Sequence, residues 1–254
     1  MTSDNQKYQY GYSEMHPSEM YDVTMREQKA KKMLSVLDEH YSEKLETLSL
    51  LDIGCSTGII SNELSKRFGK VIGIDVDEEA IIHAKKYYQT DNLYFSVEDG
   101  MNLRFPDNFF DVVICAHVYE HVPDSHKLIS EIHRILKPEG TCYFAAGNRI
   151  TLIEPHYTLP LLSIIPKPLA NLYLRAFKKG DFYYENLLTV WRLRSLVSQF
   201  EVIDYSLKIV KNPERYSATE IVQPGSLKQK IALWVLEKAY WLFPTYVWLL
   251  RKKG

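Results

Sequence analysis

The sequence has little cysteine, almost no net charge and no long uncharged hydrophobic run. Its 254 residues include three cysteines, Cys55, Cys115 and Cys142, whose number and spacing fit neither a disulfide framework nor a metal site. The 31 basic and 32 acidic residues give a formal charge of −1, so the chain has no general attraction for nucleic acid. Residues 1–15 are polar and rich in tyrosine, which predicts no signal peptide. These absences favour a cytoplasmic protein with reduced thiols, no bound metal and no nucleic-acid partner.

The most hydrophobic stretch, residues 231–250, is interrupted by Glu237, Lys238 and Pro244. Charges and a proline inside such a run argue against a membrane-spanning helix. We expect an apolar C-terminal helix within residues 224–254 that packs in the core or forms the face of a homodimer. The alternative is an interfacial helix that contacts a membrane surface and ends in basic residues.

A regular alternation of strand-like and helix-like segments begins near residue 48. Dense apolar runs indicate buried strands, and segments with helical spacing separate them. This alternation predicts βαβ units, and hence an α/β fold with a doubly wound, mostly parallel sheet. The first five strands are expected at residues 48–54, 70–75, 92–99, 109–118 and 140–148, and the helices between them at 58–68, 77–88 and 125–138.

The alternation breaks after Asn148, which suggests how the chain is divided. An insertion with four prolines and many large apolar residues follows and predicts a helical cap after the fifth strand. The chain then returns to the core, with a helix at 189–200 and candidate strands at 201–210 and 214–222. Near the N-terminus a helix is expected at 29–45, and residues 8–23 form either a tyrosine-rich lid or an ordinary flexible terminus. The predicted divisions are 1–45, 46–148, 149–188, 189–223 and 224–254.

A glycine turn between the first strand and the next helix is the clearest ligand-binding signal. The segment from Asp52 to Gly58 reads D-x-G-x-x-x-G, and a turn at this edge of a parallel sheet binds ligands. It has no glycine at position 56, where G-x-G-x-x-G requires one, and no lysine as in a phosphate-binding loop. Asp75 and Asp99 end the next two strands, where they can accept hydrogen bonds from a ribose and an adenine. An acidic strand end suits an ammonium better than a phosphate, so the ligand that fits best is S-adenosylmethionine.

Four motifs in order strengthen this interpretation: LLDIGCSTG, VIGIDVDEEAI, VEDGMNLRFPDNFFDVVICAHVYEHVPD and EIHRILKPEGTCYF. Together they resemble the motifs of class I S-adenosylmethionine-dependent methyltransferases, the type 11 branch in particular, over residues 46–147. The resemblance implies a Rossmann-like sheet of seven strands, the last one antiparallel, and S-adenosylmethionine as cofactor. Ser56 stands where the family usually has glycine, and we expect a slightly altered turn there.

The resemblance also implies roles for single residues. Asp52 and Gly54 would contact the methionine end of the cofactor, Asp75 the ribose, and Asp99 and Met101 the adenine. The full predicted cofactor set is Asp52, Gly54, Cys55, Ser56, Gly58, Asp75, Val76, Asp99, Gly100, Met101, Cys115 and Ala116.

Two polar segments are candidates for the chemistry. His117 and His121 follow the fourth strand, and an imidazole can take a proton near neutral pH. His156 and Tyr157 open the insertion, which should hang over the acceptor side of the site. Each of these residues has a structural alternative, because His117 or His121 can shape the site and His156 can satisfy backbone groups of the insertion.

The sequence therefore predicts an S-adenosylmethionine-dependent methyltransferase acting on a small apolar or amphipathic acceptor at oxygen, nitrogen or carbon. One alternative is a non-catalytic protein of the same fold that binds S-adenosylmethionine or a nucleotide. The other is a methyltransferase for a lipid-linked acceptor at the membrane surface, which would suit the apolar insertion and tail.

Overall fold

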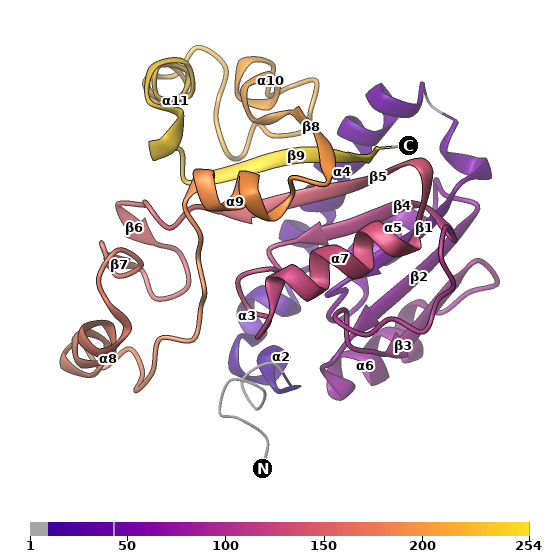
Figure 1. Ribbon diagram of the computed structural model, residues 1–254, viewed down its shortest axis with the longest axis horizontal. Helices are drawn as coiled ribbons and strands as arrows, with labels where there is room; N and C mark the ends of the chain where they lie inside the picture. The colour runs from indigo at the N-terminus through magenta and orange to yellow at the C-terminus, as the bar shows by residue number, and fades with distance from the viewer. Residues whose placement is uncertain (1–9, 43, 254) are drawn as a thin grey trace.

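The computed structural model describes residues 10–42 and 44–253, and its centre is a sheet of seven strands (Figure 1). The strand order is β3-β2-β1-β4-β5-β9-β8. The first five strands run parallel, and β9 runs antiparallel to both of its neighbours, β5 and β8. The predicted doubly wound, mostly parallel sheet of seven strands is confirmed. The strands are β1 (Ser49–Ile53), β2 (Lys70–Asp75), β3 (Leu93–Val97), β4 (Phe110–Ala116), β5 (Leu136–Gly147), β8 (Phe200–Asp204) and β9 (Thr245–Lys252).

Helices cover both faces of the sheet and bury its central strands on both sides. One face packs against α7 (Ser125–Ile135) and α9 (Val190–Leu196). The other packs against α4 (Val23–Tyr41), α5 (Ile59–Ser65), α6 (Glu78–Tyr88) and α10 (Ser206–Lys211). Neighbouring residues of one strand belong to opposite cores, as Leu50 and Leu51 do in β1. This period of two explains the dense apolar runs in the sequence.

The tail differs from the single apolar helix that the sequence predicted. It forms α11 (Leu227–Lys238), a 3₁₀ turn η2 (Tyr240–Leu242) and then strand β9. Pro244 cannot continue a helix, and the residues after it alternate between the two cores, with Trp248 on one face and Leu249 on the other. The prediction holds for residues 227–238 and is wrong for 245–252, which form the seventh strand of the core.

The candidate strands at 201–210 and 214–222 also need correction. The first is shorter than predicted, because β8 ends at Asp204, whose Oδ1 accepts a hydrogen bond from the N–H of Ser206 and starts α10. The second forms turns and no strand. Asn212 and Pro213 end α10, and Pro213 has no N–H to give to a strand ladder.

The insertion at 149–188 forms a hairpin and one helix rather than several short helices. Strands β6 (Ile153–Glu154) and β7 (Leu159–Pro160) pair antiparallel, and α8 (Lys167–Ala176) follows. Leu159, Leu162, Ala170, Leu174 and Tyr183 form a small core of its own. In Figure 1 this segment extends beyond the end of the sheet, away from the β3 edge.

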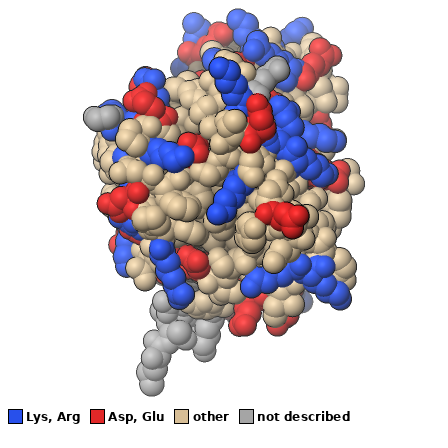
Figure 2. Space-filling model, turned by 90° about the vertical axis from the view of Figure 1, so that its right-hand side faces the viewer, with Lys and Arg blue, Asp and Glu red and all other residues tan. Residues whose placement is uncertain are grey.

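The N-terminal segment contributes two short helices, α2 (Tyr12–Met15) and α3 (Pro17–Met20), before the long helix α4. Helix α4 begins six residues earlier than predicted, because Asp22 caps it by accepting a hydrogen bond from the N–H of Met25 at 2.9 Å. A 3₁₀ turn η1 (Leu45–Thr47) leads into β1. Charged side chains of both signs spread over the face shown in Figure 2, as the near-zero net charge suggests.

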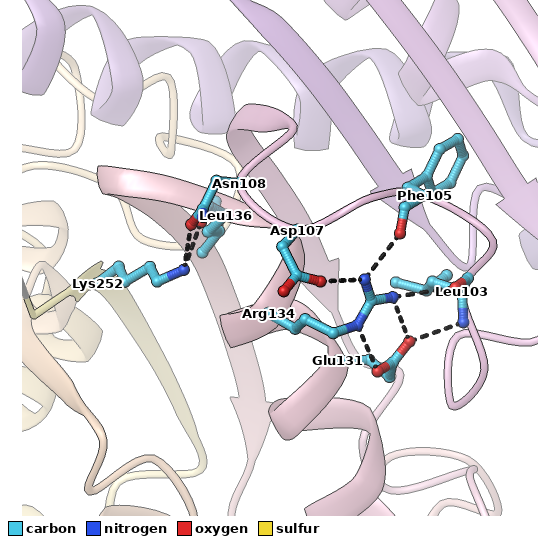
Figure 3. Close-up of polar contacts among 8 residues, drawn as sticks. All are labelled: Leu103, Phe105, Asp107, Asn108, Glu131, Arg134, Leu136 and Lys252. Atoms are coloured by element: carbon cyan, nitrogen blue, oxygen red, sulfur yellow. Dashed lines mark hydrogen bonds and ion pairs between the residues drawn. The ribbon is translucent and has the colours of Figure 1, made fainter.

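Arg134 fixes the loop that leads from β3 to β4 (Figure 3). Its guanidinium donates to the backbone oxygens of Leu103 and Phe105, at 3.0 and 2.8 Å. It also binds Asp107 and the carboxylate of Glu131, and Glu131 in turn accepts from the N–H of Leu103. A side chain of α7 thus orders the loop directly after Asp99–Met101, and this limits how far that part of the predicted site can move.

Candidate functional site

A cavity of about 550 Å³ lies at the carboxyl ends of the parallel strands. This is the edge of a doubly wound sheet where ligands bind. Eleven of the predicted site residues line it: Asp52, Gly54, Ser56, Asp75, Val76, Asp99, Gly100, Ala116, His117, His121 and His156. Five others do not line it: Cys55, Gly58, Met101, Cys115 and Tyr157.

The glycine turn bends sharply after β1. The N–H groups of Gly54 and Cys55 both donate to the carbonyl of Ile74, at 2.8 and 3.0 Å, which joins the turn to β2. Gly54 has φ +74°, and a Cβ there would lie 2.7 Å from Cγ2 of Val118. Ser56 also has a left-handed backbone, with φ 50°, so the departure from glycine places a side chain in a conformation that costs about 1 kcal/mol or more. The turn keeps its shape nonetheless, because Asp75 holds the N–H of Ser56.

Gly58 serves packing rather than the cavity. Its φ is +84°, and a Cβ there would lie 2.7 Å from Cβ of Ala84 and 2.8 Å from the ring of Phe95. The residue lets the start of α5 approach α6 and β3 closely. This explains why it belongs to the motif without facing a ligand.

Asp75 joins three segments around the cavity. Its Oδ2 accepts from the N–H of Ser56 at 2.8 Å, and its Oδ1 accepts from the N–H of Asp77 at 3.0 Å. Asp77 in turn caps α6 and accepts from the N–H of Ser13 at 2.8 Å. Burial raises the pKa of Asp75 despite these hydrogen bonds. Each carboxylate oxygen has a second lone pair, so both can still accept hydroxyl groups of a ligand.

Asp52 is the buried acid of the site. It is 3% exposed, and its Oδ2 accepts from the hydroxyl of Ser61 at 2.6 Å. Burial raises its pKa to about 7, against the opposing effects of Ser61 and the positive charge of Arg26. The carboxyl group therefore titrates near neutrality and would be ionised by a bound cation.

Arg26 is a site residue that the sequence analysis missed. It is 6% exposed, lines the cavity, and interacts electrostatically with Asp52 and Asp75. Its Nε donates to the carbonyl of Glu19 at 3.1 Å. The signal was present in the sequence, because Arg26 lies four and seven positions before Ala30 and Met33, which share the buried face of α4. A cation on an apolar helix face points to an anionic partner.

The N-terminal segment covers the glycine turn. The hydroxyl of Thr57 donates to the carbonyl of Met20 at 2.6 Å, and Tyr12, Ser13 and Met20 line the cavity. Tyr12 stacks on His16 and contacts the ring of His121, with centroids 5.2 Å apart. The described part of the predicted lid, from residue 10 onward, therefore lies over the cavity. Residues 8 and 9 lie outside the described residues.

Asp99 and Gly100 form the cavity wall after β3. Oδ1 of Asp99 accepts from the N–H of Met101 at 2.8 Å, which turns the chain away, so that Met101 packs against the core instead of lining the cavity. Gly100 is buried, and a Cβ there would lie 2.9 Å from Cγ2 of Ile53. The wall at this point is therefore backbone and the Asp99 carboxylate.

His117 and Glu120 form a pair directly after β4. His117 has φ 59°, and its Nδ1 lies 3.1 Å from Oε1 of Glu120. Glu120 is fully buried, and its Oε2 has no hydrogen-bond partner among the described residues. Burial tends to raise the pKa of Glu120, but its contact with His117, the charge of His121 and a backbone hydrogen bond together lower it, so the carboxylate is ionised and orients the imidazole of His117.

The other predicted catalytic residues differ in environment. Burial lowers the pKa of His121 to about 4, so this ring is neutral at physiological pH. Burial opposes protonation of His156 too, but its hydrogen bond to Glu154 and the charges of Glu185 and Glu154 raise its pKa to about 9. The hydroxyl of Tyr157 donates to the carbonyl of Phe182 at 3.3 Å, outside the cavity. Tyr157 is therefore not brought together with the other three.

Residues 51–144 match the family model described as a methyltransferase domain. A ubiquinone biosynthesis O-methyltransferase from Coxiella burnetii is 31% identical over 133 residues, which cover 48% of this chain and 57% of that protein. The chain thus spans little more than half the length of this curated relative. Residues 51–144 are thus similar to a methyltransferase domain. The resemblance inferred from the four motifs is confirmed for this segment.

Solved structures are similar to this chain in fold, and the similarity extends well beyond residues 51–144. A chain from the complex between the Haloferax volcanii Trm112 methyltransferase activator and a putative methyltransferase aligns with a TM-score of 0.56 and 18% identity, covering 100% of both chains. A putative sarcosine dimethylglycine methyltransferase from Galdieria sulphuraria aligns with a TM-score of 0.54 and 17% identity, covering 89% of this chain and 86% of that one. At these identities the alignments show a shared fold.

The cysteines lie beside the cavity without lining it. Cys55, Cys115 and Cys142 are buried free thiols, and burial raises the pKa of each. A buried neutral thiol is a poor nucleophile, so these residues act as small core side chains. Cys55 and Cys115 belong to the predicted cofactor set, but their side chains face the cores.

Proposed function

We propose that this chain is an S-adenosylmethionine-dependent methyltransferase acting on a small apolar or amphipathic acceptor. The observation that carries the proposal is the set of three carboxylates, Asp52, Asp75 and Asp99, at successive strand ends along one cavity, with a single buried guanidinium, Arg26, beside the first two. Carboxylates suit an ammonium and hydroxyl groups, and a guanidinium suits a carboxylate. S-adenosylmethionine carries all of these groups and no phosphate.

The residues fit that cofactor in order along the cavity. Asp52 and the backbone of Gly54 would hold the ammonium, and Arg26 the carboxylate of the methionine end. Asp75 would accept the ribose hydroxyls with the lone pairs that Ser56 and Asp77 leave over. Asp99 would accept the adenine amine, with Val76 and Gly100 along the base. When bound, S-adenosylmethionine supplies a methyl group on a sulfonium.

The acceptor end lies at Ala116, His117 and Glu120. An ionised, fully buried Glu120 orients the ring of His117, which can take the proton of an acceptor hydroxyl at its other nitrogen. The lid residues Tyr12 and Met20 would exclude water and help to hold the acceptor at attack distance. Oxygen is the favoured site of methylation because the curated relatives are named as O-methyltransferases.

We also propose that α8 brings the protein to a membrane surface. Its side chains Leu169 and Leu172 and the following Phe177 are 58, 59 and 58% exposed, and Lys178 and Lys179 come next. Exposed apolar residues beside basic ones suit an anionic lipid surface. Among the described residues, no helix is both long and apolar enough to cross a membrane. Co-sedimentation with phosphatidylglycerol vesicles should therefore exceed that with phosphatidylcholine vesicles, and Leu172→Asp should abolish it while Leu207→Asp does not. Pelleting of neither vesicle type, with a dimer in size-exclusion chromatography, would assign this face to a second copy.

The function itself is tested by methyl transfer from labelled S-adenosylmethionine to a panel of phenols, catechols, amines and carboxylic acids. We expect label in at least one hydroxyl acceptor, and we expect His117→Asn to lower kcat while leaving cofactor affinity unchanged. Cofactor binding without transfer to any acceptor, even with vesicles present, would favour the non-catalytic alternative.

A further inference from the structure

Two histidines and a glutamate converge where the insertion meets the loop after β4. His121 lies in that loop, His156 in the turn between β6 and β7, and Glu185 in the segment between α8 and α9. Their ligand-capable atoms all lie within 4.8 Å of one another. They come from three separate segments, so no spacing motif marks them, and the sequence predicted no metal site. Within residues 10–42 and 44–253 this is the single group of three histidine, cysteine or acidic side chains so arranged.

A buried carboxylate fixes the ring of His156. Oε1 of Glu154 lies 2.7 Å from Nδ1 of His156, and Oε2 of Glu154 accepts from the N–H of Tyr157 at 2.9 Å. Glu154 is fully buried. Because Nδ1 is engaged, Nε2 is the nitrogen that can ligate an ion. Histidine ligands of metals are held in this way, with a carboxylate on the other ring nitrogen.

His121 completes the nitrogen pair. Its ring is perpendicular to that of His156, with centroids 5.1 Å apart. Imidazole nitrogens are common ligands of transition-metal ions, and these two rings bring theirs to one place.

The charge around these residues favours a cation. Glu120, Glu154 and Glu185 are 0, 0 and 1% exposed, and buried carboxylates need compensating positive charge. His117 lies 3.1 Å from Glu120 and His156 lies 2.7 Å from Glu154, while Glu185 lies close to both His121 and His156. The negative charge of these carboxylates favours a dication between His121, His156 and Glu185.

We propose that His121, His156 and Glu185 form a binding site for a divalent transition-metal ion such as Zn²⁺. Two imidazoles and one carboxylate are a donor set that Zn²⁺ accepts, with a fourth position left open. Ligand atoms around tetrahedral Zn²⁺ lie roughly 3.4 Å apart, so small side-chain rotations close the observed spacing. His121 and His156 line the cavity, so the open position faces it and can take an oxygen of a bound small molecule. The ion site itself does not depend on methyl transfer. If the bound small molecule is the methyl acceptor, that identification rests on the proposed function.

The test is metal binding by the full chain after treatment with a chelator and dialysis against Zn²⁺. We expect one equivalent of Zn²⁺ by mass spectrometry of the metal and a rise in melting temperature on its addition. His156→Ala and Glu185→Gln should lose both effects, and Glu154→Gln should weaken Zn²⁺ about 10–100-fold by releasing the ring. His126→Ala, which removes an exposed histidine of α7, is the matched control and should bind like the wild type.

Binding of less than a tenth of an equivalent, or equal binding by the wild type and all variants, would overturn the site. If a variant fails to fold by circular dichroism, Co²⁺ added to the wild-type protein decides instead. Intense visible absorption from four-coordinate Co²⁺ supports the site, and the weak absorption of six-coordinate Co²⁺ overturns it. Neither readout uses S-adenosylmethionine, so failure here is distinct from failure of the proposed methyl transfer.

Discussion

The Oδ2 atom of Asp75 accepts a hydrogen bond from the backbone N–H of Ser56 at 2.8 Å. This contact ties the end of β2 to the glycine turn that follows β1. Through Asp77, which binds the N–H of Ser13, the same corner also reaches the N-terminal lid. Asp75 thus orders the glycine turn and the loop after β2 directly, and the N-terminal lid through Asp77. Its proposed contact with the ribose would come in addition to this structural role.

Replacing Asp75 should therefore weaken cofactor binding more than loss of a ligand contact alone would. Asp75→Ala removes the acceptor for two backbone N–H groups, and hydrogen bonds to a charged group contribute about 1.5–3 kcal/mol each. We expect the affinity for S-adenosylhomocysteine to fall at least about 100-fold, together with a lower melting temperature. Calorimetry and thermal denaturation measure the two effects. Asp91→Ala, at an exposed acid, is the control, and an Asp75→Ala variant that binds like it would refute the role.

Gly54→Ala should be more damaging than glycine conformation alone explains. A Cβ at Gly54 would lie 2.7 Å from Val118, whereas Gly225 has nearly the same φ, +73°, and open space around it. Gly225→Ala therefore measures the left-handed strain by itself, about 1–2 kcal/mol in unfolding free energy. We expect a larger loss for Gly54→Ala in urea denaturation, and partial recovery in the double variant with Val118→Ala. Equal losses for the two alanines would show that the contact with Val118 is unimportant.

The pKa of Asp52 predicts a pH-dependent affinity. Its carboxyl titrates at about 7 in the folded protein, above its ordinary value, and a ligand ammonium prefers the ionised form. Between pH 6 and 8 the ionised fraction rises about tenfold, so the apparent Kd for S-adenosylhomocysteine should fall about tenfold. Asp52→Asn should bind the ligand weakly, and its affinity should lack the pH dependence that comes from ionisation of Asp52. This variant therefore distinguishes the titration of Asp52 from that of other groups. A wild-type profile parallel to that of Asp52→Asn would contradict the assignment.

Arg26→Met should lower cofactor affinity by about 10–100-fold. The substitution keeps the apolar stem but removes the buried cation beside Asp52 and Asp75. It should also raise the pKa of Asp52 further, so the pH profile moves to higher pH. Lys31→Met, at an exposed position of the same helix, is the matched control. Unchanged affinity in Arg26→Met would exclude the guanidinium from the cofactor site.

The sequence predicted the first half of the fold well because its signals are local. Dense apolar runs mark the strands from β1 to β5, and each turn of the motif follows its strand within a few residues. The prediction for the tail was wrong for a physical reason. A short apolar segment such as 245–250 is compatible with a buried helix and with a central strand, and its sequence alone does not distinguish them. In the fold this segment pairs with β5 on one side and β8 on the other, and no local sequence pattern shows those partners.

The site shows the same division. Strand-end acids could be placed from the sequence, since parallel strands end at one edge of the sheet. For Arg26 the sequence offers only its place on the apolar face of α4; that this face brings it to Asp52 and Asp75 depends on how α4 packs in the fold. His156 lies beside His121 because the folded insertion packs over the loop after β4. The two residues are far apart in the sequence, so no local pattern predicts this contact.

Calorimetric titration of the purified wild-type chain with S-adenosylhomocysteine tests most directly whether the cavity holds S-adenosylmethionine. We predict one binding site with micromolar affinity and a matching rise in melting temperature. No heat of binding and no thermal shift at millimolar ligand, in protein that is folded by circular dichroism, would contradict the proposal that this cavity holds S-adenosylmethionine.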